Sequence, residues 1–513
     1  MTAVASLPAL LGRLEDYGRL RRAVAEGKHA LALTGLAAVH RALLAAALHR
    51  DSGRPLVAVC ADEGEAKRLA GDLAAFLETE VPILPARDFL FHPGEASREW
   101  EHRRIALFAA LAAGTCPVLV ATVEGLLQRT LPPEALRAAT RTLVPGQQCR
   151  PEELADWLAA GGYVRCDQVE GVGQFALRGG ILDVFSPGLD LPVRMEFWGD
   201  EIDSLGLFDP VTQRRTAAHQ ERCTLLPAGE VLGTDEGVRD LALPRLWPTV
   251  STAADHLPGN ALVALCDTPR VAERARNYLW QLGEDVTALL EQGVLTGKAP
   301  AFAKGLDEVC AGLRPGTLLY LDAFATGTLP VPPDFLLSLT ARQLPGYGVS
   351  FEAVAEDLAQ YRREKFAVVV LAPTRRKAEA LQEMLRARQL PSAFDEQLRD
   401  APEPGAITIA VGDLSAGFDW PDGRFAVLAE GAQAPAPRKT RRRAKQTAGR
   451  ERLESFTDLA PGDLVVHEHH GIGRFAGMVD MTVDGVRRDY LKLQFAGADV
   501  LYVPALQLDL VSK

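Results

Sequence analysis

Hydrophobic residues near the start of the chain fall into short continuous runs, each followed by a segment with helical spacing. The runs are Ala30–Leu33, Leu56–Cys60 and Val118–Ala121, and the helical segments include Asp62–Leu77 and Val123–Arg129. Strands that are buried on both faces give continuous apolar runs, and an alternation of strand and helix is typical of a parallel sheet covered by helices. The first part of the chain is therefore predicted to be a parallel α/β domain.

The pattern changes at about residue 142. Paired glycines separate β-rich runs at Ile181–Phe185, Val193–Trp198 and Ile202–Phe208, which predicts a small α+β insertion. The α/β pattern then returns, with the strand Ala261–Cys266 leading into the helix Arg270–Leu279.

A further small α/β domain is predicted from about residue 345. Phe366–Leu371, Ala406–Val411 and Ala426–Leu428 have the composition of strands, and Arg375–Arg388 has that of a helix. Nothing in this segment suggests a chemical role, so we interpret it as structural.

The last third of the chain contains a change in composition. Eight Lys and Arg residues between Gln433 and Arg452 stand against one acid, Glu451, which is typical of a linker. Short strands follow, with a hairpin signal at Asp484-Gly485, and predict a small twisted sheet or β-barrel. These strands are Asp463–His467, Phe475–Val483, Asp489–Phe495 and Val500–Val503.

The predicted segments are residues 1–141 and 223–344 for the first α/β domain, 142–222 for the insertion, 345–432 for the small α/β domain, 433–455 for the basic linker and 456–513 for the β domain.

Composition narrows the classes of protein. The chain has 513 residues, of which 47% are hydrophobic and 24% charged, and a net charge of −11, so a strongly basic DNA-wrapping protein is excluded. None of the seven cysteines forms a C-x-x-C pair, which favours free thiols over a zinc site or a disulfide framework. Ile105–Val123 lacks charges over a length that could span a bilayer. The sequence Gly114-Thr115-Cys116-Pro117 inside it indicates instead a helix end followed by a buried strand, so we expect no membrane association and a cytoplasmic protein.

A phosphate-binding loop is expected after the first strand of a nucleotide-binding α/β domain, but its motif is missing. The motif G-x-x-x-x-G-K-[ST] needs small residues for close backbone approach, a lysine for the phosphates and a hydroxyl for magnesium. Aligned from Gly35, the chain has His40, Arg41 and Ala42 at the three decisive places. We therefore expect a degenerate loop without ATP hydrolysis, no bound cofactor and no catalytic residue in this chain.

Three segments of the insertion resemble a known module. Gly162–Val169, Phe175–Phe185 and Arg194–Asp203 are similar to the UvrA-binding domain that is shared by the excision-repair protein UvrB and the bacterial transcription-repair coupling factors (Mfd). The C-terminal part decides between these families. Pro461–His467 and Gly471–Phe475 resemble the RNA-polymerase-interacting domain of the coupling factors, as do Tyr490–Leu493 and Leu501–Pro504, and UvrB has no such domain.

The resemblance implies residues for UvrA recognition in the insertion. They are Arg165, Arg178, Phe185, Arg194 and Glu196. Guanidinium groups bind carboxylates through two parallel hydrogen bonds, and an aromatic side chain can anchor an interface. The alternatives remain open that Phe185 fills the core of the insertion and that the arginines form ion pairs within the domain.

The resemblance also implies a contact with the β subunit of RNA polymerase at Leu491, with Tyr490 and Lys492 beside it. We expect this contact to form by pairing at a strand edge. Alternation along Asp489–Phe495 places Leu491, Leu493 and Phe495 on one face, so a role in the domain core is the alternative.

A histidine cluster and a basic run are not interpreted as binding sites. The sequence His467-Glu468-His469-His470 lacks nearby ligands to complete a tetrahedral site, so no metal is expected. The basic run at 438–452 is expected to be a solvated linker that contacts DNA weakly at most.

The resemblance implies an adaptor that binds RNA polymerase and recruits UvrA in nucleotide excision repair. In the family, two helicase motor domains and a regulatory domain that covers the UvrA surface follow this region. Since the sequence stops at Lys513, we expect a truncated chain that does not translocate DNA and that binds UvrA constitutively. ATP and Mg²⁺ are expected only with those motor domains. The alternatives are a UvrB-like ATPase that verifies DNA damage and a stand-alone transcription regulator with a similar polymerase-binding domain.

Overall fold

The computed structural model separates the chain into two units, residues 1–435 and 436–513. It describes residues 2–89, 91, 98–233, 239–325, 327–346, 351–398, 402–430, 464–467, 471–483, 486–494, 500–504 and 511–512. Each unit is described separately below.

A seven-stranded parallel sheet forms the centre of the first α/β domain, with the strand order β17-β1-β16-β15-β2-β4-β3. Helices α3 and α4 pack in one hydrophobic core on one face, and α5, α10 and α11 pack in a second core on the other face. Both faces are covered because the five interior strands, β1, β16, β15, β2 and β4, are almost entirely apolar and buried. The strands are β1 (Ala30–Thr34), β2 (Leu56–Cys60), β3 (Ile83–Leu84), β4 (Val118–Thr122), β15 (Leu262–Cys266), β16 (Thr317–Leu321) and β17 (Phe335–Ser338). The helices are α3 (Ala38–Ser52), α4 (Glu63–Leu77), α5 (Glu99–Ala112), α10 (Thr268–Glu291) and α11 (Leu306–Gly312).

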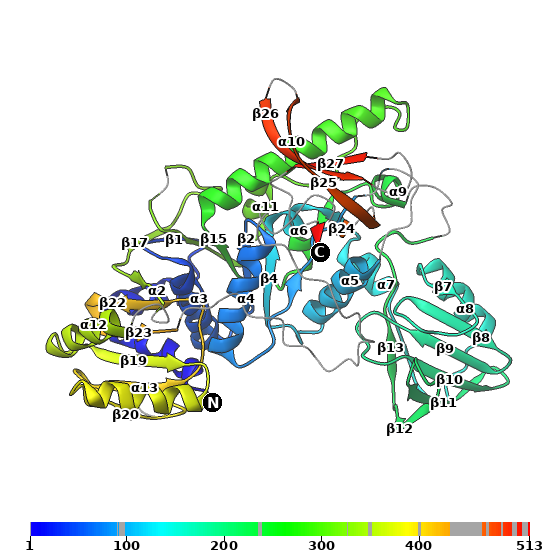
Figure 1. Cartoon of the computed structure of the whole chain (residues 1–513). Coiled ribbons are helices and arrows are strands. Elements are labelled where there is room, and N and C mark those ends of the chain that lie inside the picture. Colours follow the sequence, from blue (N-terminus) through cyan, green and yellow to red (C-terminus); the bar gives the residue numbers. More distant parts are fainter. Residues whose placement is uncertain are drawn as a thin grey trace. The chain divides into compact units, whose positions relative to one another are not determined.

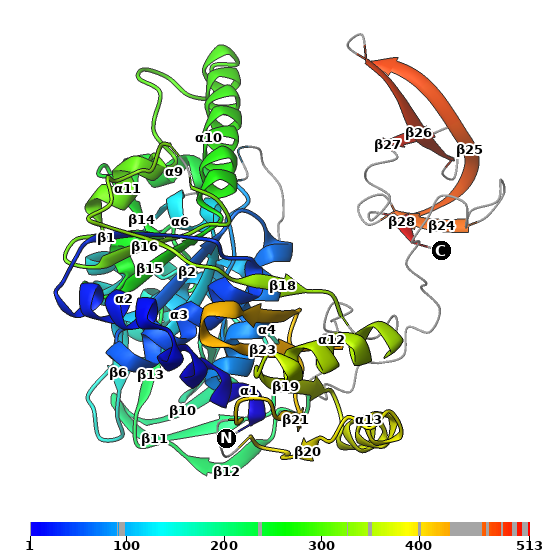
Figure 2. The same ribbon diagram turned by 90° about the vertical axis from the view of Figure 1, so that its left-hand side faces the viewer.

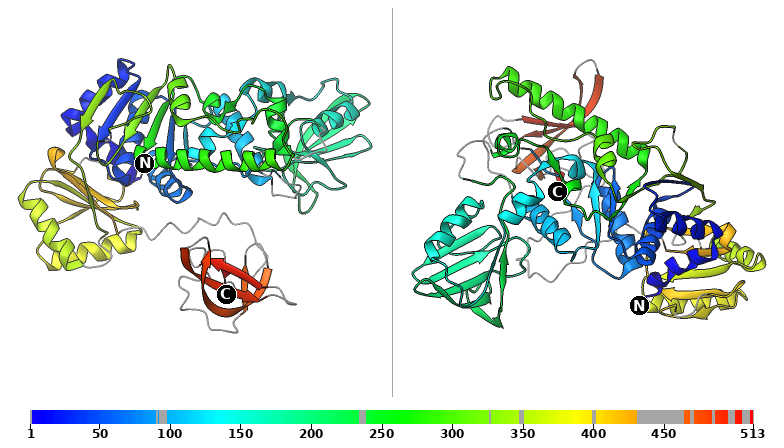
Figure 3. Two further views of the ribbon diagram at one scale, coloured as in Figure 1. Left: turned by 90° about the horizontal axis from the view of Figure 1, so that it is seen from above. Right: turned by 180° about the vertical axis from the view of Figure 1, so that it is seen from behind.

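The predicted strands agree with this sheet, whereas two helix lengths differ. The helix predicted at 123–129 ends at Leu127, and the chain continues as the short strand β5. Helix α10 begins at Thr268 with a proline in its first turn and continues to Glu291, well beyond the predicted end (Figure 3). The uncharged window at 105–123 is divided between α5 and β4, and within the described residues no helix is long and apolar enough to cross a membrane.

The insertion is a six-stranded sheet with the order β12-β11-β10-β9-β8-β7, antiparallel except for the β7–β8 pair. Helix α8 (Pro151–Ala160) packs on one face of it (Figure 1). The chain enters and leaves through the antiparallel pair of β6 (Arg141–Leu143) and β13 (Cys223–Leu225), where the predicted segment 142–222 begins and ends. The strands are β7 (Val164–Arg165), β8 (Gln174–Arg178), β9 (Ile181–Phe185), β10 (Val193–Trp198), β11 (Glu201–Phe208) and β12 (Arg215–His219).

The small α/β domain has a mixed sheet with the order β18-β22-β23-β19-β21-β20. One face shares the hydrophobic core of α3 and α4, and the other packs against α12 and α13 in a core of its own. This domain is therefore joined to the first by continuous packing. The elements are β18 (Arg342–Leu344), α12 (Phe351–Arg363), β19 (Ala367–Ala372), α13 (Arg375–Ala387), β20 (Ala393–Phe394), β21 (Ile407–Val411), β22 (Gly417–Trp420) and β23 (Phe425–Leu428).

The second unit is an antiparallel sheet with the order β27-β26-β25-β24-β28. This agrees with the predicted small β-sheet, and among the described strand pairs none joins β27 to β28, so closure into a barrel stays a prediction. Strand β25 is bent along its length (Figure 2), and its register with β26 shifts between Phe475 and Gly477, as expected of a bulge. The strands are β24 (Leu464–His467), β25 (Gly471–Val483), β26 (Val486–Gln494), β27 (Val500–Pro504) and β28 (Val511–Ser512).

Shorter elements complete the first unit. They are α1 (Ala3–Ser6), η1 (Leu7–Arg13), α2 (Glu15–Ala25), α6 (Val123–Leu127), β5 (Arg129–Thr130), α7 (Pro133–Ala138), α9 (Arg239–Leu246), β14 (Ser251–Thr252), η2 (Ala253–His256) and η3 (Pro421–Gly423).

Candidate functional sites: a filled nucleotide position and an open sheet face

The loop after β1, where a phosphate would bind, is filled by other backbone. The amide of Gly35 donates to the carbonyl of Ala323 at 3.1 Å, and that of Leu36 donates to Asp322 at 3.0 Å. A Cβ on Gly35 would lie 1.8 Å from the carbonyl oxygen of Leu339, whose amide donates to Thr34. These two loop amides are engaged, and the space beside Gly35 is occupied, so neither amide is available to a phosphate.

Helix α3 buries the residues that replace the phosphate-binding motif. His40 and Ala42 are fully buried, and the His40 ring lies edge-on to Phe418 and Trp420, with ring centres 5.4 and 5.2 Å away. Burial lowers the pKa of His40 to about 4, so the ring is neutral at pH 7. The contacts of His40 are thus with the core that the first and small α/β domains share.

Arg41 supplies the only positive charge among these three residues, and internal carboxylates bind it. Its Nη1 lies 3.5 Å from Glu65 Oε1, and its Nη2 lies 3.3 Å from Asp267 Oδ2. Arg41 is 5% exposed, and burial raises the pKa of Glu65. This guanidinium contributes to folding through these ion pairs.

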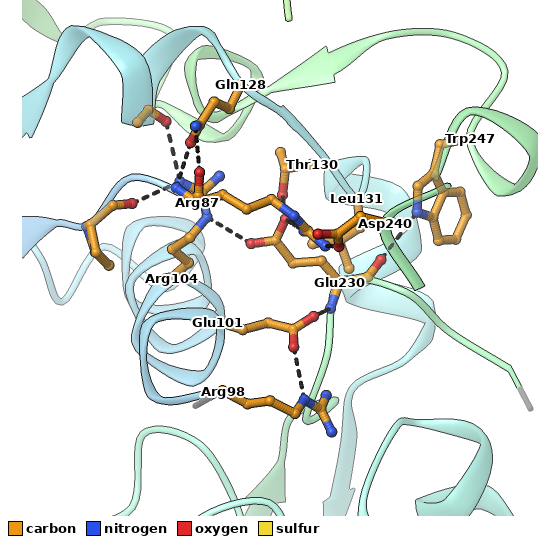
Figure 4. A network of polar contacts seen from close by, with 12 residues as sticks. Arg87, Arg98, Glu101, Arg104, Gln128, Thr130, Leu131, Glu230, Asp240 and Trp247 are labelled. Atoms are coloured by element: carbon orange, nitrogen blue, oxygen red, sulfur yellow. Dashed lines mark hydrogen bonds and ion pairs between the residues drawn. The ribbon is translucent and has the colours of Figure 1, made fainter. Parts of the chain in front are cut away.

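A buried polar network connects the α/β domain to the segment that follows the insertion (Figure 4). Glu230 is fully buried and accepts hydrogen bonds from Arg87 Nη1 at 2.8 Å, Arg104 Nε at 2.7 Å and Thr130 Oγ1 at 2.7 Å. Arg87 also pairs with Asp240. Sequence reasoning missed this network because its members are far apart in the chain and share no spacing.

The same network reaches the base of the insertion. Arg98 pairs with Glu101 and donates to the carbonyls of Gly162 and Ala228, while Glu101 accepts a hydrogen bond from the amide of Glu230. Because buried charges are costly without partners, these contacts anchor the insertion to the α/β domain.

Among the described residues, no helix packs on the face of the insertion sheet opposite α8, and the segment around Val169 covers one part of that face. Register places Asp183 opposite Arg194 and Ala176, and it places Ile181 opposite Glu196 and Arg178. Side chains at paired positions lie on the same side of a sheet. We call the face that carries Arg178, Ile181, Asp183, Arg194, Glu196 and Trp198 the open face.

A buried carboxylate organises two of the predicted arginines on the open face. Asp183 is fully buried and accepts hydrogen bonds from Arg194 Nε at 2.7 Å and Nη2 at 2.8 Å, and from Arg178 Nη2 at 2.9 Å. The Arg194 guanidinium also lies 4.6 Å from the ring centre of Phe208, and its hydrogen bond to Asp183 raises its pKa. The open alternative of intradomain ion pairs therefore holds for both arginines, although the Arg178 side chain stays 47% exposed.

Glu196 also has partners within the domain. It accepts hydrogen bonds from Ser204 Oγ at 2.8 Å and from Arg215 Nη1 at 2.9 Å. The hydrogen bond from Ser204 and the nearby Arg215 lower the pKa of Glu196. Arg215 is a member of the cluster that sequence reasoning missed.

The remaining two predicted residues are not part of this polar cluster, although Phe185 follows Ile181 and Asp183 on the same side of β9. Phe185 is 6% exposed and packs with Val169, Ala176 and Phe208, so its ring fills the core of the insertion, as the alternative interpretation had it. Arg165 is exposed, but β7 pairs it with Phe175, which lies in the core on the α8 side. The structure brings Arg178, Arg194 and Glu196 together and separates Arg165 from them.

In the second unit, β26 is an interior strand at the predicted polymerase contact. Leu491 pairs with Met478 of β25 and with Val503 of β27, so pairing of a partner strand at this position is excluded and the expectation of edge pairing is wrong. Leu493, which alternates with Leu491 along β26, is fully buried, whereas Lys492 is half-buried. Only the backbone is described at Tyr490 and Leu491.

Other predicted features fall partly outside the described residues. The basic linker, the turn at 484–485 and residues 468–470 of the histidine cluster lie outside them. Within the described part of the chain, no group of three or more His, Cys, Asp or Glu residues could hold a metal ion. All seven cysteines are free thiols.

Comparison with known proteins defines the two interaction domains. Residues 142–230 match the UvrB interaction domain, and residues 459–513 match the CarD-like/TRCF RID domain. The chain thus combines, in one polypeptide, a domain of the UvrB type with one shared by CarD-like proteins and coupling factors.

Two known proteins are similar to nearly the whole chain. The transcription-repair-coupling factor of Bacillus subtilis is 25% identical over 97% of the chain, and that of Staphylococcus aureus strain Mu50 is 27% identical over 94%. The resemblance to the coupling factors is confirmed. The chain spans just under half the length of these relatives, 46% and 45% respectively.

Proposed function

We propose that this chain is an adaptor that binds the β subunit of RNA polymerase and recruits UvrA to stalled transcription complexes. The observation that carries the proposal is the presence of both interaction domains in one chain, at residues 142–230 and 459–513. Two modest interfaces on one polypeptide raise the effective concentration of one partner near the other. The mechanism is therefore tethering, and needs no chemistry in the chain itself.

The filled position after β1 supports a non-catalytic role for this part of the protein. Two loop amides donate to backbone carbonyls, and the one cation of the altered motif, Arg41, is paired with Glu65 and Asp267. A UvrB-like ATPase would need these groups free for phosphates and magnesium. We expect no binding of ATP with Mg²⁺ to this chain in isothermal titration calorimetry, and a saturable signal would revive the ATPase alternative.

The open face supports the assignment of the UvrA surface to the insertion. Arg178 uses only Nη2 in a described hydrogen bond, and nearly half of its side chain remains accessible. Such a guanidinium can still form charge-assisted hydrogen bonds with carboxylates of a partner. Arg194 and Glu196 would act mainly by stabilising the open face through their bonds to Asp183, Ser204 and Arg215.

A bridging experiment tests the proposal directly. The immobilised polymerase β subunit is incubated with the chain and then with UvrA, and retention of UvrA is measured with and without the chain. We expect UvrA to be retained only when the chain is present. Leu491→Arg should abolish retention by removing polymerase binding, whereas Arg178→Glu should reduce UvrA retention and leave polymerase binding intact.

The outcomes separate the two interfaces. If Leu491→Arg binds polymerase like the wild type, polymerase remains the partner but its binding site does not include Leu491 of β26. Absence of polymerase binding at tens of micromolar would overturn the adaptor and leave a UvrA-binding module. Absence of UvrA binding by the wild-type chain would favour the stand-alone transcription regulator. Contact between the basic linker and DNA is expected to be weak and strongly dependent on salt.

A further inference from the structure

An exposed tryptophan ends the open face of the insertion. Trp198 is 84% exposed, and it follows Arg194 and Glu196 at two-residue intervals along β10. Successive alternate residues of a strand lie on the same side, about 7 Å apart. Ile181, which is 37% exposed, lies opposite Glu196 on the neighbouring strand.

A tight hairpin fixes the position of this tryptophan. Trp198 pairs with Glu201, and only Gly199 and Asp200 lie between them. Gly199 has a φ of 61°, which a two-residue hairpin turn of this kind needs and which glycine adopts without strain. The backbone that carries the indole is thus held in place, so docking of the indole does not require the backbone beneath it to be ordered.

We propose that Trp198, together with Ile181, is the apolar anchor through which the open face docks on UvrA. The proposal rests on the proposed function and deepens it. The aromatic anchor expected at Phe185 is unavailable, because that ring is in the core. Tryptophan and arginine are the residues most enriched at the energetic centres of interfaces, and the exposed guanidinium of Arg178 lies on the strand next to Ile181.

Charge defines the chemistry of the partner surface. On this face Asp183 is fully buried under Arg178 and Arg194, and Glu196 is bonded to Ser204 and Arg215. Glu201, opposite Trp198, accepts a hydrogen bond from Gln148, so three guanidinium groups stand beside three carboxylates that already have partners within the domain. The matching surface of UvrA is an apolar pocket for the indole, bordered by at least one carboxylate that accepts from Arg178.

Titration of the chain with purified UvrA tests the anchor. Trp198→Ala should raise the dissociation constant for UvrA about tenfold or more, as expected when an interface tryptophan is truncated. Trp198→Phe should restore part of the lost affinity. Trp280→Ala is the matched control, because Trp280 is 66% exposed on α10 outside the insertion, and its affinity should stay within about twofold of the wild type. Thermal unfolding of the Trp198 variants should match the wild type, since the ring is exposed.

The outcomes distinguish this inference from the proposed function. If the wild-type chain binds UvrA and Trp198→Ala binds within twofold of it, the anchor is wrong while the adaptor stands. If the wild-type chain fails to bind UvrA, the proposed function itself fails. If Trp198→Ala alters only self-association, measured by analytical ultracentrifugation, the tryptophan belongs to an interface between copies of this chain and the inference is overturned.

Discussion

The filled nucleotide position and the open face use arginine in opposite ways. Arg41 is 5% exposed, with two carboxylates as partners inside the first domain, whereas Arg178 is bound to one carboxylate through one nitrogen and its side chain is 47% exposed. The first arrangement contributes to the stability of the fold and leaves nothing for a ligand. The second leaves donors at the surface. Substitutions at the buried residues of either site should therefore change stability, whereas substitution of the exposed Arg178 should change binding.

The largest effect is expected for Gly35→Ala in the filled position. Its φ of 83° and the 1.8 Å approach to Leu339 mean that a methyl group forces the backbone apart, so we expect a loss of about 3 to 5 kcal/mol in the free energy of unfolding. Gly53→Ala is the control, because Gly53 has a φ of 65° and no atom near its missing Cβ, and should cost about 1 kcal/mol. Equal losses in chemical denaturation would show that the position is not filled as described.

Asp183→Asn should have the next largest effect on stability. The substitution removes the buried charge that Arg178 and Arg194 share. We expect the free energy of unfolding, measured by urea denaturation, to fall by about 2 to 3 kcal/mol. This loss is smaller than that for a fully buried ion pair because Arg178 is half-exposed. Asp190→Asn, at an exposed position of the same domain, should be neutral. A neutral Asp183→Asn would mean that the arginines do not depend on this carboxylate.

The pH dependence of stability should reveal the buried His40. Its pKa is about 4 in the folded chain and 6.5 when exposed, so the unfolded state binds more protons between these values and stability falls as the pH falls. From pH 7.5 to 5 this contribution amounts to about 2 kcal/mol. Burial raises the pKa of Asp72 to about 6, which acts in the opposite direction. The measurement is therefore the difference between wild type and His40→Leu, and a difference independent of pH would contradict the assignment.

The smallest effect on stability is expected for Arg178→Ala on the open face. A half-exposed ion pair contributes about 0.5 kcal/mol or less, so the melting curve should hardly change. The affinity for UvrA should nevertheless fall several-fold, because Arg178 offers free donors to a partner. A loss of stability without a loss of affinity would place Arg178 with Arg41 among the purely structural arginines.

Sequence reasoning found the buried strands but missed the polar clusters. The run at 56–60 agrees with β2 because a strand that is buried on both faces is apolar along its length. The runs at 181–185 and 193–198 agree with β9 and β10, in which residues of the α8-side core alternate with residues of the open face. Nothing in the sequence pairs Glu230 with Arg87 and Arg104, which lie more than a hundred residues away. The edge pairing expected at Leu491 is wrong for a related reason: the sequence of a strand does not show whether it has one neighbouring strand or two.

The sequence by itself determined the order of α/β, inserted and β segments, the loss of the phosphate-binding motif and the resemblance to the coupling factors. Each depends on local spacing or on the identity of residues close together in the chain. Tertiary structure alone decided that Phe185 is core while Trp198 is exposed, and that Asp183 holds two arginines. Both strands alternate in the same way, and only the packing of α8 and of the segment around Val169 determines which positions water reaches.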